Sequence, residues 1–537
     1  MMRPRNQSFS DDSVRPSTSS NLQTRWVQLS LLLMAAILLM ARLDSLSFSV
    51  DEYVNVLIER GSWAEMIDHL RNGADLHPPV THFLMNLWMQ IVGESEWTIR
   101  YLWSAAGILN IALTFRLGAM LYGRRVGGLA ALLLLSAPTY LLYMRFEKYY
   151  AFTITLSLAM LLAAYALWVR QTRWRIGSYG LALVALLYTD YLAPLFLTLS
   201  LNLIVLIDGR RRQRIAAFLG TQVVAALLYI PWLTMMVTQA STLYRSGQAD
   251  LGSSWLGTLI ALGYWPYAIA VGETLLPWHF AAILSSLSVL VLGVMGLRAC
   301  LQDMQKPDPC RPGSVLFLMI LLSLAGSVWL TNWVFDSVPF IAFPNHSLFL
   351  APLLMILLAL GAARLSRSWV LLLFCGLLAG RIIGIHNYFT ATDFHNPIYA
   401  VPMREIVTGL MQSATENEAL VAAPDVGAHY YYDRLVKAEV PTALTHISLG
   451  DFVQATHAVL RLDPQRVWLF KFGRDRTAGA TGEEQMADWL AANGYTLHGE
   501  TGYVEQDSVY RKIKTVIFQR PAYPYKLLVQ EFRRHQP

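Results

Sequence analysis

The first long apolar run of the chain reads WVQLSLLLMAAILLMARL over residues 26–43. A helix needs about 20 mostly apolar residues to cross the hydrocarbon core of a bilayer. Runs of the same kind recur along the chain as far as Ile385. No small-residue cleavage site follows the first run, so we expect a retained signal anchor behind a disordered cytoplasmic N-terminus over residues 1–25.

The composition agrees with this pattern. Of 537 residues, 55% are hydrophobic and 15% are charged, whereas soluble domains carry about 25% charged residues. These values exclude a soluble enzyme and a disordered protein, and the unbroken apolar runs exclude an outer-membrane barrel, whose strands alternate. Lys and Arg outnumber Asp and Glu by 42 to 36, but the excess lies in short loops between the runs. It therefore indicates membrane orientation, and we expect no binding to nucleic acid.

Basic residues occupy every second loop between the runs, beginning with Arg124 and Arg125. Because Arg and Lys mark cytoplasmic loops, these loops and the N-terminus are predicted to be cytoplasmic, and the region after the last run is predicted to lie outside. The segment 240–278 is either an outside loop with an interfacial helix or a hidden pair of crossings. The sequence thus predicts a mainly α-helical, multi-pass membrane protein with about eleven transmembrane helices. The predicted spans are 26–44, 99–121, 128–144, 150–169, 178–190, 192–207, 215–238, 279–299, 314–331, 346–363 and 369–386.

Two folded parts follow from this division. Residues 26–390 form the predicted transmembrane domain. Its acidic first outer loop, residues 45–98, has apolar residues at helical spacing, which predicts short amphipathic helices at the interface. Residues 391–537 have the composition of a globular domain and are predicted to form a soluble α/β domain outside the membrane. Its helices are predicted near 402–413, 451–460 and 483–492, and its strands near 419–423, 466–470 and, as a pair, 500–519.

Ionisable residues are rare inside the runs and gather at the outer ends of the predicted helices. Within the runs, Arg116 and Arg381 are expected to reach the interface from span ends. The distribution favours an enzyme at the outer membrane surface over a proton-driven carrier. In the soluble domain, the four-residue spacing of Asp425, His429 and Asp433 indicates a surface helix or, alternatively, a metal site.

Three clusters at the outer helix ends are candidates for chemistry. Asp51-Glu52 is either a general base with a second carboxylate for substrate or metal, or an acidic first turn that favours the helix dipole. His77, followed by two prolines, either contacts a phosphate or carboxylate, or is exposed at a helix start. Arg145 and Lys148, in the turn between the third and fourth spans, either bind a lipid-linked phosphate or anchor an interfacial aromatic belt.

Taken in order, these clusters resemble the motifs of the bacterial GT-C glycosyltransferases, which include relatives of the protein O-mannosyltransferases and the lipid A aminoarabinose transferases. The resemblance covers roughly residues 26–390. Lys148 stands where the family usually has Arg, and Asp190-Tyr191 stands where it often has His-Tyr. The matching elements are Asp51-Glu52, His77-Pro78-Pro79, Gly93-Glu94-Ser95-Glu96 leading to Arg100, Ala137-Pro138, and Lys148 with Tyr150-Ala151.

The resemblance implies a glycosyltransferase that takes its sugar from a polyprenyl-phosphate donor and passes it to a lipid, glycan or protein of the cell envelope. It implies Asp51 as the general base, inversion at the sugar carbon, and Glu52 as a ligand for acceptor, donor or a divalent cation. The other implied substrate contacts are His77, Arg145, Lys148, Tyr150 and Asp190. A lipid-linked sugar flippase and a non-catalytic membrane scaffold are the alternative functions.

Overall fold

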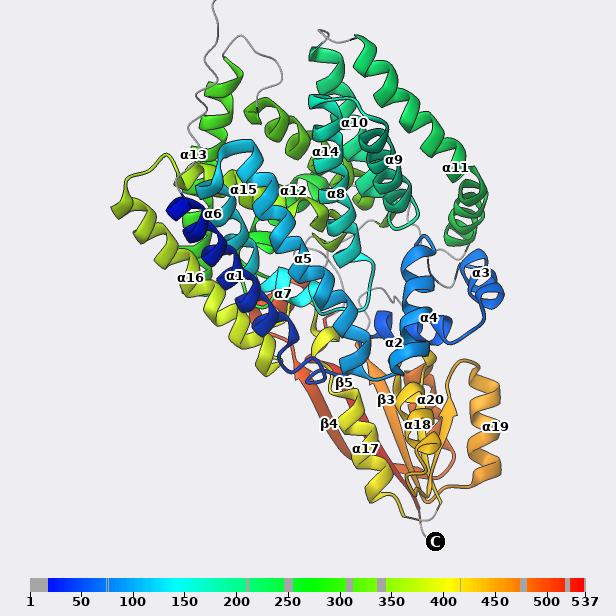
Figure 1. Cartoon of the computed structure of the whole chain (residues 1–537). Coiled ribbons are helices and arrows are strands. Elements are labelled where there is room, and N and C mark those ends of the chain that lie inside the picture. Colours follow the sequence, from blue (N-terminus) through cyan, green and yellow to red (C-terminus); the bar gives the residue numbers. More distant parts are fainter. Residues whose placement is uncertain are drawn as a thin grey trace, which may run out of the picture.

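The computed structural model describes residues 18–73, 75, 77–208, 212–245, 255–305, 312–335, 344–415, 417–473, 481–516 and 522–535. Long helices stand side by side over most of the molecule, and a small sheet with its own helices forms one end (Figure 1). Most of the predicted N-terminal segment, residues 1–25, lies outside the described residues. The first helix already begins at Thr18, before the predicted boundary.

Helices occupy all the predicted spans. Within the described ranges, six helices are long and apolar enough to cross a membrane, or seven if one bent pair is counted as a single span. Four further apolar helices are shorter, and one of them lies in the segment 240–278. The protein is therefore a multi-pass membrane protein. Its helices are α1 (Thr18–Met40), α5 (Glu96–Tyr122), α6 (Arg124–Leu135), α7 (Pro138–Met144), α8 (Tyr150–Val169), α9 (Arg173–Leu187), α10 (Leu192–Asp208), α11 (Arg212–Arg245), α12 (Trp255–Ala270), α13 (Phe280–Met304), α14 (Pro312–Phe335), η1 (Pro344–Leu350), α15 (Ala351–Ala362) and α16 (Arg367–Thr390).

The third predicted span is broken rather than continuous. Helices α6 and α7 meet at an angle of 70°, and Pro138 begins the second of them. The last carbonyls of α6 are satisfied by Arg381, which donates to Leu133 O at 2.5 Å and Ser136 Oγ at 2.6 Å. The same guanidinium donates to Ala270 O, at the end of α12, at 2.7 Å. Arg381 is fully buried, so the expectation that it reaches the interface is wrong.

The first outer loop folds into three short helices between the membrane helices and the sheet (Figure 1). These are α2 (Val50–Glu59), α3 (Trp63–Arg71) and α4 (Val80–Val92). Ser49 and Ser62 each start a helix with a capping box, in which the serine hydroxyl and a glutamate three residues later satisfy each other's backbone amides. The loop is thus a folded layer that fixes the side chains of the acidic pair.

The C-terminal part carries a five-stranded mixed sheet in the order β2-β1-β3-β5-β4. Strand β1 pairs in parallel with β2 and β3, and β5 runs antiparallel to β3 and β4. The predicted strand pair near 500–519 is partly wrong, because a helix occupies 508–516. The elements are η2 (Pro397–Ala400), α17 (Met403–Ser413), β1 (Glu418–Ala422), η3 (Pro424–Val426), α18 (Ala428–Lys437), β2 (Leu444–Ser448), α19 (Phe452–Leu462), β3 (Arg466–Phe472), α20 (Gly482–Ala492), β4 (Tyr495–Glu505), α21 (Ser508–Val516) and β5 (Tyr525–Arg534).

The two faces of this sheet have different neighbours. Val421 and Leu469 point into a small core with α19 and α20. Leu420 and Phe470, on the other face, belong to the apolar core that continues into the membrane helices. The C-terminal part is therefore held against the first outer loop by a shared core.

Candidate active site

The acidic pair stands in the first turn of α2, which its capping box fixes. Successive residues of a helix point about 100° apart, because one turn takes about 3.6 residues. The two carboxylates accordingly have different surroundings. The side chain of Asp51 is 51% exposed, whereas Glu52 is 1% exposed.

Glu52 is bound on both oxygens by Arg100, with Nε–Oε1 and Nη2–Oε2 distances of 2.8 Å. The amides of Glu147 and Ser49 also donate to Glu52, at 3.2 Å and 3.0 Å. The remaining donors of Arg100 reach the carbonyls of Leu43, Leu46 and Ser47. All five N–H groups of the guanidinium are therefore used. The structure does not bring Glu52 to an exposed site; it ties the segment between α1 and α2 to α5.

Asp51 faces a different partner. Lys148 Nζ lies 3.5 Å from Asp51 Oδ1 and 3.6 Å from Asp75 Oδ2. Burial alone would lower the pKa of Lys148, but Asp51, Asp75 and Glu147 together raise it above its usual value. Burial alone would likewise raise the pKa of Asp75, but His77 and Lys148 hold it well below its usual range. We call Asp51, Asp75, His77 and Lys148 the outer cluster, which is charged and reaches the surface through Asp51.

Aromatic and polar residues form a wall beside the outer cluster. The His77 ring contacts Asp75 through Nδ1 and packs on Tyr149, with ring centroids 4.1 Å apart. The Tyr149 hydroxyl lies 3.1 Å from His346 Nδ1. Next to it, the hydroxyl of Tyr150 accepts a 2.5 Å hydrogen bond from an amide side chain, that of Asn345.

Two predicted site residues, Arg145 and Asp190, hold helix ends through their hydrogen bonds. Arg145 is 2% exposed and donates to the carbonyls of Leu38 and Arg42 at the end of α1, at 3.3 Å and 2.8 Å. It therefore braces α1 and does not point into the outer cluster. Asp190 is also buried, and its Oδ1 accepts the amide of Ala193 at 2.7 Å, which caps the start of α10.

The sequence analysis missed a buried carboxyl pair behind the outer cluster. Burial, with Glu147 and Asp75, raises the pKa of Glu59 well above its usual value, and burial with Glu52 raises that of Glu147. The two carboxyl groups therefore favour a shared proton. His82 Nδ1 lies 3.0 Å from Glu59 Oε1, and burial lowers the pKa of His82 to about 4, so this ring is neutral at pH 7. The sequence did indicate that Glu59 is buried like Glu52, because the two lie seven residues apart, about two turns, on the same face of one predicted helix.

A second missed group is Glu273, in the connection between α12 and α13. Its Oε2 accepts the Tyr143 hydroxyl at 2.7 Å. Burial raises the pKa of Glu273 to about 7. The Tyr143 ring also contacts Tyr399, at 6.3 Å between centroids. No motif in the sequence marks these residues, because they meet through the tertiary fold.

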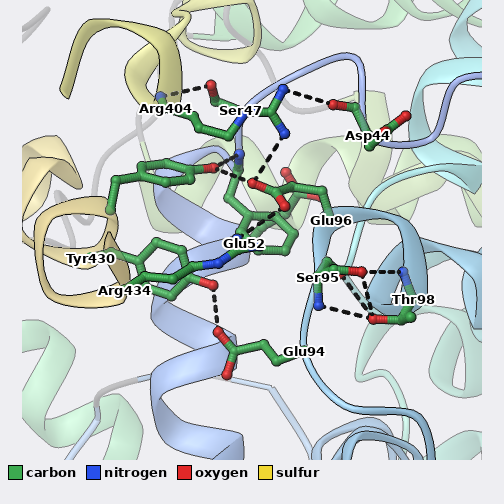
Figure 2. A network of polar contacts seen from close by, with 12 residues as sticks. Asp44, Ser47, Glu52, Glu94, Ser95, Glu96, Thr98, Arg404, Tyr430 and Arg434 are labelled. Atoms are coloured by element: carbon green, nitrogen blue, oxygen red, sulfur yellow. Dashed lines mark hydrogen bonds and ion pairs between the residues drawn. The ribbon is translucent and has the colours of Figure 1, made fainter. Parts of the chain in front are cut away.

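Side chains of the C-terminal part contact the first outer loop at Glu94 and Glu96, as Figure 2 shows. From α18, Tyr430 donates to Glu94 Oε1 at 2.5 Å and Arg434 donates to Glu96 Oε2 at 2.9 Å. From α17, Arg404 Nη1 lies 3.5 Å from Glu96 Oε1. We call this arrangement the docking network. The helix expected around His429 is real, but one of its faces is buried against the first outer loop.

Among the residues that the structure describes, no group of three His, Cys, Asp or Glu side chains is arranged to hold a metal ion. The alternative of a metal site at Asp425, His429 and Asp433 stays untested, because the side chain of Asp425 is outside the described part; His429 and Asp433 lie on α18.

Comparison with known proteins gives a match to part of the sequence and a likeness in fold. Residues 76–235 match the family model described as dolichyl-phosphate-mannose-protein mannosyltransferase. No curated protein sequence matches the chain.

The structure is similar to that of ArnT from Cupriavidus metallidurans in the apo state, with a TM-score of 0.54 and 14% sequence identity over 95% of this chain and 98% of that one. It is similar to ArnT bound to undecaprenyl phosphate, with a TM-score of 0.52 and 13% identity over 96% and 98% of the two chains. The predicted resemblance is thus confirmed at the level of fold: this multi-pass chain has the fold of the GT-C membrane glycosyltransferases.

Proposed function

We propose that the protein is a glycosyltransferase that moves a sugar from a polyprenyl-phosphate donor to a lipid, glycan or protein acceptor on the outer face of the bacterial cytoplasmic membrane. The observation that carries this proposal is the contact between half-exposed Asp51 and buried Lys148. A carboxylate beside an ammonium suits a reaction that needs a base and releases an anionic leaving group. The ArnT fold supports a lipid phosphate as the carrier of the sugar, because one of those ArnT structures holds undecaprenyl phosphate.

The two partners of Lys148 suggest how the donor engages. Asp75 is buried and holds the ammonium from one side, whereas Asp51 holds it from the exposed side. A phosphate arriving from the surface takes the place of Asp51 next to Lys148. Asp51 is then released from its ion pair, and its carboxylate oxygens are available to the acceptor hydroxyl. Donor binding would therefore prepare the group that activates the acceptor.

The proposed chemistry is a single displacement. Asp51 takes the proton from the acceptor hydroxyl while the hydroxyl oxygen attacks C1 of the sugar. The bond between C1 and the phosphate oxygen breaks, and its electron pair leaves with the polyprenyl phosphate. A phosphate is a stable anion, so the leaving group needs no general acid, and Lys148 stabilises its developing charge. Attack from the face opposite the leaving group inverts C1.

The neighbouring residues take supporting roles in this proposal. His77 and Tyr150 form the wall against which the donor lies. Glu52, with Arg100, positions Asp51 by fixing the first turn of α2, so it binds neither substrate nor metal directly. Arg145 and Asp190 hold helix ends in place. Transfer assays with EDTA and with added Mg²⁺ or Mn²⁺ test the divalent cation that the resemblance left open.

The decisive experiment is the substitution Asp51→Asn, with Asp68→Asn, which changes an exposed acid on α3 of the same outer loop, as a control. We expect transfer from a labelled polyprenyl-phosphate sugar to fall by about 10²–10⁴-fold in the first variant, because a general base contributes on this scale. Donor binding and thermal stability should not change. Transfer at the wild-type rate by Asp51→Asn would refute the base assignment. A flippase would move intact donor across the bilayer, and a scaffold would leave it unconsumed.

A further inference from the structure

A second polar cleft lies away from the outer cluster, where the chain leaves the membrane helices. It has a volume of about 560 Å³. One wall is the segment 391–397, directly after α16, and the other is the segment 504–510, from the end of β4 into the start of α21. Leu276, just before α13, also lines the cleft, so the cleft lies where the C-terminal domain meets the membrane domain.

The lining is acidic. Asp393, Glu505 and Asp507 contribute carboxylates, and the lining residues include neither Lys nor Arg. Gln506 also lines the cleft, is 5% exposed, and its Oε1 atom has no hydrogen-bond partner among the described residues. A buried amide oxygen without a donor costs free energy that a ligand donor would recover. The guanidinium of Arg511 donates to the Gln506 carbonyl at 3.1 Å.

The backbone of both walls is held in an uncommon conformation. Ala391, Asp393 and Val504 have φ angles of 57°, 54° and 57°, in the left-handed region. Such angles are rare for residues other than glycine, and rarest for a β-branched residue such as valine. Residues of this kind persist where the surroundings fix them, and they gather at binding sites. Asp507 Oδ1 accepts the amides of Val509 and Tyr510, both at 2.9 Å, which fixes the second wall.

The chemistry of the cleft selects its ligand. The carboxylates and the Gln506 amide oxygen are hydrogen-bond acceptors, so the ligand must bring donors. The negative charge disfavours a phosphate and favours a cation. Within the described part of the chain the carboxylates do not converge as metal ligands do. The rings of Phe394 and Tyr510 also line the cleft, and aromatic faces attract organic cations.

We propose that this cleft binds a primary ammonium group, carried either by a lipid headgroup or by a water-soluble amine. The site goes beyond the proposed sugar transfer, and its binding can be measured without it. It is nevertheless linked through packed residues to the turn that carries Lys148. Its first wall continues into η2, where the Tyr399 ring lies 5.1 Å from that of Phe146, and His395 donates its amide to Glu273 O at 2.9 Å.

Two matched pairs of probes test the site on the full-length protein in detergent. Native mass spectrometry would compare phosphatidylethanolamine with phosphatidylcholine of the same acyl chains. Calorimetry would compare a glucosamine tetramer with its N-acetylated counterpart. We expect the member with the primary ammonium to bind about tenfold more tightly in at least one pair, because hydrogen bonds to charged groups are strong. The pair that discriminates identifies the source of the amine.

The substitution Glu505→Gln removes a charge while preserving shape, and Asp393→Asn does the same on the other wall. Each variant should lose the preference for the ammonium probe. Asp488→Asn, which changes an exposed acid on α20, should keep it. Equal binding within both pairs, or an unchanged preference in both cleft variants with an unchanged melting temperature, would overturn the proposal.

Discussion

Asp51 and Glu52 are neighbours in one helical turn, yet they belong to two regions of opposite character. The outer cluster around Asp51 is partly exposed, and its Lys148 forms ion pairs with both Asp51 and Asp75. The region around Glu52 is buried, and every donor of Arg100 has a partner. The difference shows that a partly exposed charge, such as that of Asp51, is available for a reaction. A buried charge whose hydrogen bonds are all satisfied, such as that of Arg100, stabilises the fold.

The largest effect should come from breaking the buried pair. The substitution Arg100→Met leaves the Glu52 carboxylate buried without a cation, which typically costs about 3–5 kcal/mol of stability. Thermal and denaturant unfolding of the purified protein would measure it. The double variant Arg100→Met with Glu52→Met should recover much of the loss. If the single variant is as stable as the wild type, the pair does not brace the loop between α1 and α2.

The corresponding substitution in the outer cluster, at Lys148, should affect the rate of sugar transfer. Lys148→Met should reduce sugar transfer by about 10²–10³-fold, because it removes a group that stabilises charge on the leaving phosphate. Lys148→Arg keeps the charge and should retain most of the activity. Initial rates at saturating donor measure both variants. Equal loss in the two would show that the geometry of the ammonium, rather than its charge, is required.

Glu273 extends the comparison of Asp51 with Glu52, because its carboxyl group is buried with no cation beside it among the described residues. Glu273 has a pKa of about 7 in the folded protein, against about 4.3 for a free glutamate. The folded state thus favours the protonated form. The stability from this proton is complete below about pH 4 and is lost as the pH rises through 7, to a total of about 3 kcal/mol.

Glu273→Gln removes the titration and keeps an acceptor for the Tyr143 hydroxyl. The variant should therefore be more stable than the wild type at pH 8–9, with a smaller difference at pH 5. Melting temperatures across this range give the comparison. A parallel pH dependence in both proteins would place the titration on another group.

The smallest effect is expected in the docking network at the edge of the buried region. The side chain of Arg434 is 31% exposed, and partly exposed ion pairs contribute about 1 kcal/mol or less. Arg434→Met should therefore lower stability only slightly, measured beside Arg100→Met in the same unfolding assay. A loss as large as that of Arg100→Met would mean that Glu96 depends on this single cation.

Much of the fold could be predicted from the sequence because long apolar runs are a strong and local signal. The break between α6 and α7 was less visible, since the run 128–144 is apolar on both sides of Pro138. Strands β2 and β5 and helix α21 were missed in the C-terminal part, because the second strand of the predicted pair near 500–519 lies at Tyr525–Arg534. The segment Ser508–Val516 contains valine and tyrosine, which favour strands, and its helix depends on the cap from Asp507.

The candidate site was predictable only in part. Asp51, His77 and Lys148 lie far apart in the sequence, and their association was expected from motif order rather than from local pattern. Asp75 was counted only as one of several acidic residues in the outer loop. Its contact with Lys148 depends on how the loop packs against the turn between α7 and α8. In the sequence, Arg145 looks like a phosphate ligand, because it is an arginine in an outer turn. Its hydrogen bonds to the carbonyls of Leu38 and Arg42 show its structural role, and they depend on the tertiary fold.

Arg381 carries a consequence for how the protein is assembled. Its charge lies in the interior of the helix bundle, where its described hydrogen-bond partners are two carbonyls, a hydroxyl and a thioether from other segments. Helix α16 alone offers this side chain none of those partners, so inserting α16 by itself into lipid is costly. The α6–α7 break and the end of α12 precede α16 in the chain. We therefore expect these segments to enter the bilayer before α16, in the order of synthesis. Insertion of α16 should be complete only once the hydrogen-bond acceptors of Arg381 are in place.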